Sequence, residues 1–284
     1  MKPAPFRYHA PRTIDEVVGL LDGLEDARVL AGGQSLMPMM NMRIVQPTHI
    51  IDINRVEGLS YIRRDGEVLE VGAMTRQRDL EFDGVVKETF PLMHEAVQQI
   101  GHRQTRNRGT LGGSLCQLDP SAELVTVAAA VDATVVVTSK AGTREIPFAD
   151  FPLGLMSPAI EPNELVTAVR FPLWRRGHGF AFVEFARRHG DFAIASAAVL
   201  LEMQNGRVAR ASVMVGGLES RPQRPEISLE GREASPTLFA DVAQACDRLE
   251  AMNDANVTAG YKRRVARAMV LRALEKAHGR IAKN

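Results

Sequence analysis

The sequence predicts an α+β protein built from more than one structural unit, and two patterns along the chain carry that prediction. Over residues 1–57, apolar helix and strand patterns alternate, which favours a small α/β layer with parallel strands. From residue 58 onward hairpin signals appear, which favour antiparallel sheet. A break near residues 172–177, with the sequence PLWRRG, precedes a part in which strands come first and helices last. We therefore expect an α/β part over 1–57, a mixed α+β part over 58–175 and an α+β domain over 176–284, with an antiparallel sheet covered by helices.

The first part begins with a helix signal. Thr13 and Glu16 have the spacing of a capping box, and apolar residues follow Thr13 at helical spacing: Ile14, Val17, Val18 and Leu21. A buried strand over 28–31 then leads into Gly32-Gly33. We expect a short helix over 35–42 and a strand over 49–53 after it.

Two hairpin signals organise the rest of the chain. Asp65-Gly66 joins the expected strands 61–64 and 68–72, and Asn205-Gly206 joins the expected strands 194–203 and 208–216. Between the hairpins we expect helices over 91–100 and 121–131 and strands over 134–138, 144–147 and 165–171. The C-terminal helices are expected over 237–250 and 259–278.

Composition narrows the classes of function. Lys and Arg total 35 against 34 Asp and Glu, so no net charge points to nucleic acid or to a membrane surface. The apolar run 124–137 is interrupted by Asp132 and is too short to span a bilayer. The N-terminal residues lack an apolar signal region, so we expect a cytoplasmic protein without integral membrane association.

The two cysteines, Cys116 and Cys246, are far apart in the sequence. An iron–sulfur cluster takes about four thiolates and a structural zinc about four ligands. The chain is therefore not expected to hold either by itself, and we interpret both cysteines as small apolar core residues.

Two glycine pairs are candidates for binding a diphosphate. Ala31-Gly32-Gly33-Gln34-Ser35-Leu36 lies at a strand-to-helix junction, and Thr110-Leu111-Gly112-Gly113-Ser114 lies shortly before another expected helix. Glycine allows the backbone to approach phosphate oxygens closely, helix N-termini supply N–H donors, and the flanking hydroxyls of Ser35, Thr110 and Ser114 can add hydrogen bonds. Ordinary turns explain most single Gly-Gly pairs, so either pair alone is weak evidence, and the two pairs together strengthen the interpretation.

Both motifs also carry a family resemblance. AGGQSLMPMMNMRIVQPTHIIDINRV and IGHRQTRNRGTLGGSLCQLDPSAEL closely resemble the FAD-binding medium subunit of the xanthine dehydrogenase and carbon monoxide dehydrogenase family, the molybdenum hydroxylases. RRHGDFAIASAAV and VGGLESRPQR resemble that family's C-terminal domain. The resemblance implies a two-part FAD-binding domain of the vanillyl-alcohol oxidase (PCMH) type over 1–175, followed over 176–284 by the C-terminal domain of the medium subunit. No G-x-G-x-x-G or Walker A motif is present, in agreement with a non-Rossmann fold.

The resemblance also implies site residues. Ala31 to Leu36 and Thr110 to Ser114 would wrap the FAD diphosphate, and Glu123 would contact a ribose. Ile100, Gly101 and Leu165 would lie near the adenine, Phe192 against the isoalloxazine, and Asp119 would support the second glycine loop or form a plain turn. The family's second motif commonly reads Gly-Gly-Asn where this chain has Ser114, and many members have Asp where this chain has Glu123. Both substitutions keep hydrogen-bonding ability.

Other polar residues are interpreted structurally. Arg103, Arg106 and Arg108 precede the second motif, and we expect them on a solvated loop rather than at a phosphate or an acidic partner. His102 and His189 have no placed catalytic partner, so we expect structural roles for them. No residue of the chain is expected to be a general acid or base.

The function implied is that of the flavin subunit of a three-part enzyme. Non-covalent FAD would take electrons from 2Fe-2S clusters on a small subunit, and a molybdopterin-binding large subunit would hydroxylate the substrate, in a dimer of heterotrimers. One alternative is a stand-alone FAD-dependent reductase or oxidase of the same fold, although the first glycine motif lacks a placed His for covalent linkage. The other alternative is a non-enzymatic scaffold without cofactor.

Overall fold

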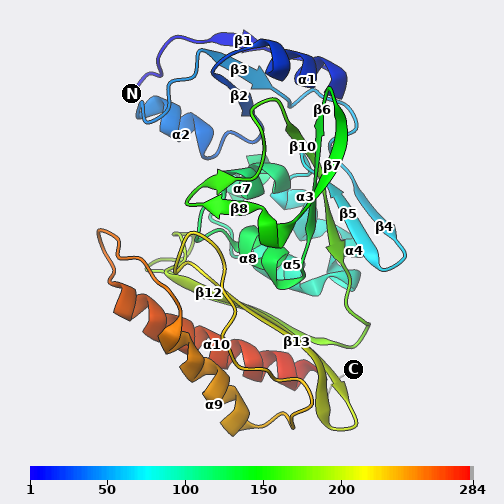
Figure 1. The fold of residues 1–284 in the computed structure, drawn as a ribbon, viewed down its shortest axis with the longest axis vertical. Coiled ribbons are helices and arrows are strands. Elements are labelled where there is room, and N and C mark those ends of the chain that lie inside the picture. The colour runs from blue at the N-terminus through cyan, green and yellow to red at the C-terminus, as the bar shows by residue number, and fades with distance from the viewer. Residues whose placement is uncertain (282–284) are drawn as a thin grey trace.

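The computed structural model describes residues 1–281, in which three hydrophobic cores follow one another along the long axis (Figure 1). It confirms the predicted α+β class. The N-terminal core lies between a three-stranded parallel sheet, in the order β1-β3-β2, and helix α1. The elements of this part are β1 (Arg7–His9), α1 (Ile14–Gly23), β2 (Ala27–Leu30), α2 (Leu36–Asn41) and β3 (His49–Asp52). The predicted capping box at α1 is present, with Thr13 Oγ1 accepting from the Glu16 backbone N–H at 3.2 Å.

The middle part is built on a five-stranded antiparallel sheet in the order β4-β5-β10-β6-β7, with helices packed against it (Figure 1). The last strand in sequence, β10, occupies the central position, so its pairing with β5 and β6 closes the sheet. The strands are β4 (Ile62–Asp65), β5 (Val68–Gly72), β6 (Thr134–Ser139), β7 (Gly142–Pro147) and β10 (Leu165–Pro172), with a small hairpin of β8 (Pro152–Gly154) and β9 (Ser157–Pro158). The helices are α3 (Gln77–Phe82), α4 (Gly84–Thr89), α5 (Pro91–Val97), α6 (Arg103–Arg108), α7 (Leu111–Gln117), α8 (Glu123–Ala130) and the 3₁₀ turn η1 (Phe148–Asp150).

The C-terminal part is a three-stranded antiparallel sheet, β11-β12-β13, held between two layers of helix. Its elements are β11 (Gly179–Phe185), β12 (Ala195–Gln204), β13 (Arg207–Gly216), α9 (Pro236–Ala245), η2 (Cys246–Arg248) and α10 (Ala259–Ile281). Side chains alternate between the faces of a strand. Accordingly Ala181 and Val183 pack with α9 and α10, whereas Phe182 packs into the core of the middle part.

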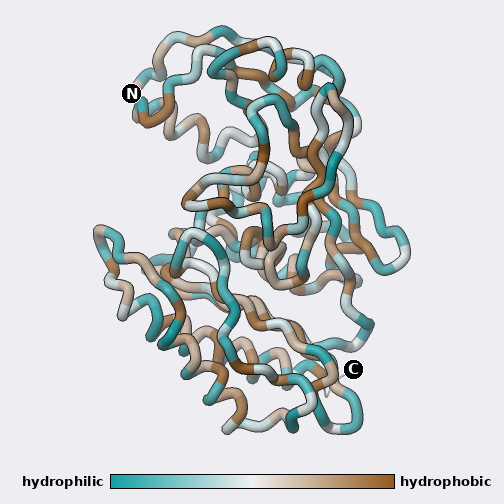
Figure 2. The backbone as a smooth tube through the Cα atoms, viewed as in Figure 1, coloured by the Kyte–Doolittle hydropathy of each residue, from teal (hydrophilic) through white to brown (hydrophobic). Residues whose placement is uncertain are grey.

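Burial of apolar side chains holds these layers together. Figure 2 shows hydrophobic residues concentrated along the strands and on the helix faces turned toward them, with hydrophilic residues common at outer loops. Phe148, Phe151 and Phe171 are among the largest fully buried side chains. Each such side chain contributes about 1.5–3 kcal/mol of transfer free energy. The core of the middle part is continuous with one face of the C-terminal sheet, so these two parts share apolar packing.

Both predicted hairpins form at their Gly turns, and every predicted helix and strand is present with shifted ends. Strands β1, β8, β9 and β11 and helices α3, α4, α6 and α7 were not predicted. The boundaries after residues 57 and 175 stay predictions.

Candidate cofactor site

The two glycine motifs meet in space. Ala31 to Ser35 follow β2, and Thr110 is the N-cap of α7, whose first turn contains Gly112 and Gly113. A Cβ on Gly32 would lie 2.2 Å from the carbonyl oxygen of Arg108, so only glycine allows the first loop to approach the second this closely. Segments about 75 residues apart in sequence therefore form one continuous backbone surface.

That surface presents free hydrogen-bond donors. Within residues 1–281, the backbone N–H groups of Gly32 to Leu36 donate no hydrogen bond. In the second motif, Thr110 Oγ1 accepts from the Gly113 N–H at 3.1 Å, so this hydroxyl caps α7. Backbone N–H groups left open at a strand-to-helix turn suit an anionic group such as a diphosphate.

Two residues outside the glycine motifs, Arg76 and Asn54, form hydrogen bonds where the two motifs meet. Arg76 Nη2 donates to Asn54 Oδ1 at 2.6 Å, and Asn54 Nδ2 donates to the Ala31 carbonyl at 2.8 Å. The Arg76 guanidinium also bonds to the Arg108 carbonyl oxygen. Burial, and then the charge of Arg108, lower the pKa of Arg76. Two neighbouring cations favour an anion at this place. Sequence reasoning missed Arg76 and Asn54, because neither belongs to a glycine motif and each follows a different strand.

A buried acid lies beyond the second motif. Glu123 is the first residue of α8 and is 8% exposed. Burial, with a smaller contribution from the nearby Asp119, raises the pKa of Glu123 to about 7. Apart from its own backbone N–H, the Glu123 carboxyl has no hydrogen-bond partner among residues 1–281. A buried carboxyl with unused acceptors fits a ligand hydroxyl, such as those of a ribose or a ribityl chain.

Asp119 forms a turn shortly after the second glycine loop. Its Oδ1 accepts from the backbone N–H of Ser121 at 2.9 Å, which shapes the connection between α7 and α8. Burial raises the pKa of Asp119.

The remaining candidate site residues, Ile100, Gly101, Leu165 and Phe192, differ in how far they are exposed to solvent. The Ile100 side chain is in the core, and Gly101 follows it with φ of +43°. Leu165 begins β10, and its side chain is 3% exposed in the N-terminal core. Phe192, in the loop between β11 and β12, is 72% exposed. The carbonyl of the next residue, Ala193, accepts from Ser121 Oγ at 2.8 Å, so the loop is fixed beside the α7–α8 connection.

The arginines before the second motif differ from the prediction of a solvated loop. Arg103 to Arg108 form helix α6. Arg106 pairs with Glu81 at 2.8 Å, and the two side chains are 13% and 14% exposed. The ion pair fixes α6 against α3, because both groups are largely removed from water. Their placement could not be read from the sequence, since the partner lies 25 residues earlier.

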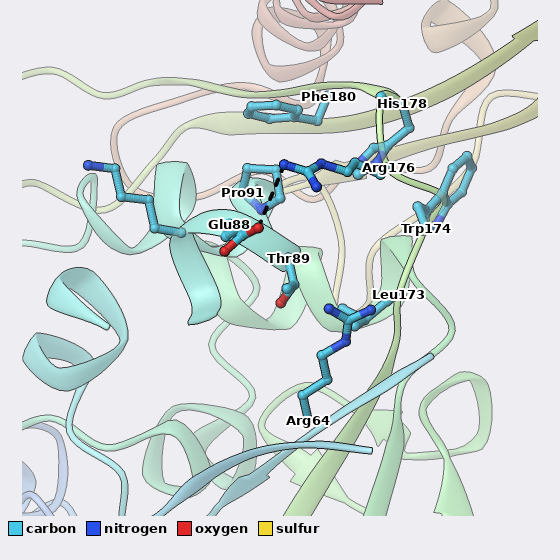
Figure 3. A pocket seen from close by; sticks show the side chains of 11 residues that line it. Arg64, Glu88, Thr89, Pro91, Leu173, Trp174, Arg176, His178 and Phe180 are labelled. Atoms are coloured by element: carbon cyan, nitrogen blue, oxygen red, sulfur yellow. Dashed lines mark ion pairs between the residues drawn. The ribbon is translucent and has the colours of Figure 1, made fainter. Parts of the chain in front are cut away.

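A separate cleft of about 760 Å³ lies at the seam between the middle and C-terminal parts (Figure 3). Arg64, Lys87 and Arg176 line it, together with Trp174 and Phe180. Each of these two aromatic rings already has an arginine of the chain over it: the Arg210 guanidinium lies 4.0 Å from the Trp174 ring centre, and the Arg280 guanidinium lies 4.2 Å from the Phe180 ring centre. No residue of either glycine motif lines this cleft, so it is distinct from the candidate cofactor site.

Cys246 is a buried core residue, as expected, whereas Cys116 is partly buried against the core of the middle part. Cys246 is fully buried, and burial raises the pKa of each thiol to about 12. Within the part of the chain described, no three His, Cys, Asp or Glu side chains stand where they could share a metal ion.

Comparison with known proteins decides the family. Residues 4–174 match the family model of the FAD binding domain in molybdopterin dehydrogenase, and residues 180–277 match that of the CO dehydrogenase flavoprotein C-terminal domain. The chain belongs to the FAD-binding subunits of the molybdenum hydroxylases. FAD is the cofactor of this family's domain, and the chain is an oxidoreductase subunit.

Relatives extend over the whole chain. The 6-hydroxypseudooxynicotine dehydrogenase complex subunit alpha of Paenarthrobacter nicotinovorans is 38% identical, over 98% of this chain and 96% of the relative. Carbon monoxide dehydrogenase from Hydrogenophaga pseudoflava contains a chain of the same fold, with a TM-score of 0.96 and 36% identity over 99% of each chain. Quinoline 2-oxidoreductase from Pseudomonas putida 86 gives a TM-score of 0.94 and 33% identity, over 99% of this chain and all of the other.

One further finding concerns membranes. In residues 1–281, no helix combines the length and the apolar content needed to cross a bilayer.

Proposed function

We propose that this chain is the electron-transferring flavin subunit of a molybdenum hydroxylase complex. Its FAD takes electrons from iron–sulfur clusters on a partner and passes them to a terminal acceptor. The observation that carries this proposal is the junction of the two glycine motifs, where open backbone N–H groups lie beside Arg76 and Arg108. Bound FAD supplies the redox chemistry, and the chain's own residues bind it, orient it and set the surrounding field.

The residues divide by the part of the cofactor that they fit. Ala31 to Leu36 and Thr110 to Ser114 hold the diphosphate. The first loop offers open backbone donors beside two cations, and the second loop, whose N–H groups from Leu111 to Ser114 bond within the chain, lies against it and offers the Ser114 hydroxyl. Glu123 accepts hydrogen bonds from sugar hydroxyls at the buried end of α8, and Asp119 shapes the turn before it. Ile100, Gly101 and Leu165 border the adenine. Phe192, exposed on its anchored loop, covers the isoalloxazine.

The partners follow from what this chain lacks. Its two cysteines are far apart in the sequence and too few for a cluster, so the clusters must reside elsewhere. We propose a molybdopterin-binding large subunit and a 2Fe-2S small subunit as partners, in a dimer of heterotrimers in the cytoplasm. Relatives of this one chain are named for 6-hydroxypseudooxynicotine, carbon monoxide and quinoline, which supports the proposal that substrate choice resides in the large subunit.

Copurification tests the proposal. The tagged chain, expressed in its native host, should carry flavin absorbance and bring down one large and one small subunit with molybdenum and iron–sulfur signals. Flavin bound to a lone chain that reduces substrates unaided would instead support a stand-alone enzyme. A lone chain that stays colourless after FAD is added would contradict the assignment.

A further inference from the structure

A row of three residues crosses the C-terminal sheet next to the candidate site. Glu184 on β11 pairs with Ser196 on β12, and Ser196 pairs with Gly216 on β13. Phe182, two residues before Glu184, packs into the core of the middle part, so Glu184 lies on the same face of its strand. That face packs against helix α8.

Helix α8 approaches the sheet most closely at this row. Thr126 Oγ1 lies 3.4 Å from Ser196 Oγ, and a Cβ on Gly216 would lie 2.1 Å from Thr126 Oγ1. Glu123 lies three residues before Thr126 and therefore on the same helix face. Glu123 and Glu184 thus project from opposite sides into one seam, which continues to the α7–α8 connection.

The seam holds carboxyl groups without a matching cation. Glu184 Oε2 is shielded from solvent and has no hydrogen-bond partner within residues 1–281. Burial, together with the charge of Glu123, raises the pKa of Glu184 to about 8. In the same way, burial and the charge of Asp119 both raise the pKa of Glu123. Burial of Glu123, partial burial of Glu184 and the charge of one carboxylate on the other oppose ionisation of both groups at neutral pH.

Other charged groups around the seam already have partners. On α5, the Glu95 carboxylate is paired with Arg280 and Lys276 of α10. On the opposite face of the sheet, the Lys262 ammonium donates to the Gly217 carbonyl at 3.3 Å and pairs with Asp254 at 3.2 Å. No cation within residues 1–281 forms an ion pair with Glu123 or Glu184.

We propose that Glu184 is a positioning residue for FAD, acting with Glu123 as a carboxyl pair that retains a proton at neutral pH. A proton held on Glu184 leaves Glu123 free to accept from a cofactor hydroxyl without placing two negative charges near the diphosphate. This inference rests on the proposed FAD site. It assigns to Glu184 a role in binding that depends on pH, although Glu184 lies on the C-terminal sheet and not in a glycine motif.

Flavin binding to the full-length chain tests the pair. FAD-free protein is titrated with FAD from about pH 6 to about pH 9, and the dissociation constant is read from flavin fluorescence. Above about pH 8, the constant for the unaltered chain should rise about tenfold per pH unit, as expected when binding requires one proton. Glu184→Gln, which cannot lose a proton, should change less than about twofold over that range. Glu275→Gln, on the exposed face of α10, is the matched control and should follow the unaltered chain.

Infrared spectroscopy provides a second readout that needs no FAD. The unaltered chain should show the C=O band of protonated carboxyls up to about pH 8, and Glu184→Gln should lose the part of that band that persists above about pH 7. Parallel binding curves for the unaltered chain and Glu184→Gln, or an unchanged infrared band, would overturn the inference. Absence of FAD binding at every pH would instead refute the proposed cofactor site, so the two failures are distinguishable.

Discussion

Arg280, near the end of α10, donates from Nη1 to Oε2 of Glu95 on α5 at 2.9 Å. The same Glu95 oxygen accepts from the Phe182 backbone N–H at 3.0 Å, and Lys276 binds the other oxygen. The Arg280 guanidinium also lies over the Phe180 ring. One carboxylate therefore ties the middle part to both β11 and α10, and it fixes the sheet that carries Glu184 and the Phe192 loop.

Glu95→Gln should lower the free energy of unfolding by about 1–3 kcal/mol, because Arg280 and Lys276 lose their common counter-ion in a largely buried place. Urea denaturation measures the change. Glu88→Gln is the control: Glu88 pairs with Arg176 at 3.7 Å and both side chains are exposed, so we expect a change below about 0.5 kcal/mol.

The loss of folding stability caused by Glu95→Gln should also depend on pH, and it should become smaller as pH falls. Hydrogen bonds from Arg280 and Lys276 outweigh burial, the largest single influence, and lower the pKa of Glu95 in the folded chain. Its stabilising contribution is therefore present above the ordinary carboxyl pKa of about 4.3 and is lost as pH falls through the folded value. A Glu95→Gln penalty that grew on acidification would contradict this account.

Gly32→Ala should disrupt the junction of the glycine motifs. The added methyl group would lie 2.2 Å from the Arg108 carbonyl oxygen, so the two loops must separate, at a cost of about 1–3 kcal/mol. FAD retention through gel filtration should fall with it. Gly19→Ala provides the contrast, because that helical position in α1 has open space, and there the substitution should stabilise by about 0.5–1 kcal/mol.

Arg76→Ala should weaken FAD binding by about 10- to 100-fold, since it removes a partly buried cation and its hydrogen bonds to Asn54 and the Arg108 carbonyl. Fluorescence titration at fixed pH measures the effect. Arg78→Ala, two residues away, removes a cation that lies over Phe82 instead and should leave FAD affinity nearly unchanged. Equal losses of FAD affinity in Arg76→Ala and Arg78→Ala would show that overall positive charge, and not the hydrogen bonds of Arg76, supports binding.

The FAD-free chain should lose stability as pH rises. The folded pKa values of Glu123 and Glu184, about 7 and about 8, exceed the ordinary value of 4.5. Groups with raised pKa stabilise the fold fully below the unfolded value and cease to do so as pH passes the folded value. The free energy of unfolding should therefore decline from about pH 4.5 to about pH 8, and Glu184→Gln should flatten part of that decline. Chemical denaturation across this range measures it.

The sequence alone determined the α+β class, the two hairpins, the cap at Thr13 and the two glycine motifs. These features depend on local chemistry: Asp65-Gly66 and Asn205-Gly206 favour hairpin turns, and Thr13 with Glu16 starts a helix whatever lies elsewhere. The family resemblance carried by the glycine motifs is confirmed over residues 4–174 and 180–277. The contacts that each site residue makes with FAD stay predictions.

Only the tertiary structure decided which distant groups meet. It brought Arg76 and Asn54 to the glycine motifs, paired Arg106 with Glu81 where a solvated loop had been predicted, and placed Glu184 opposite Glu123. Each of these relations joins residues from different elements, so no local pattern records it. These contacts produce a junction that favours an anion and a seam in which carboxyl groups have no cation partner. Both properties depend on burial, which the order of residues does not specify.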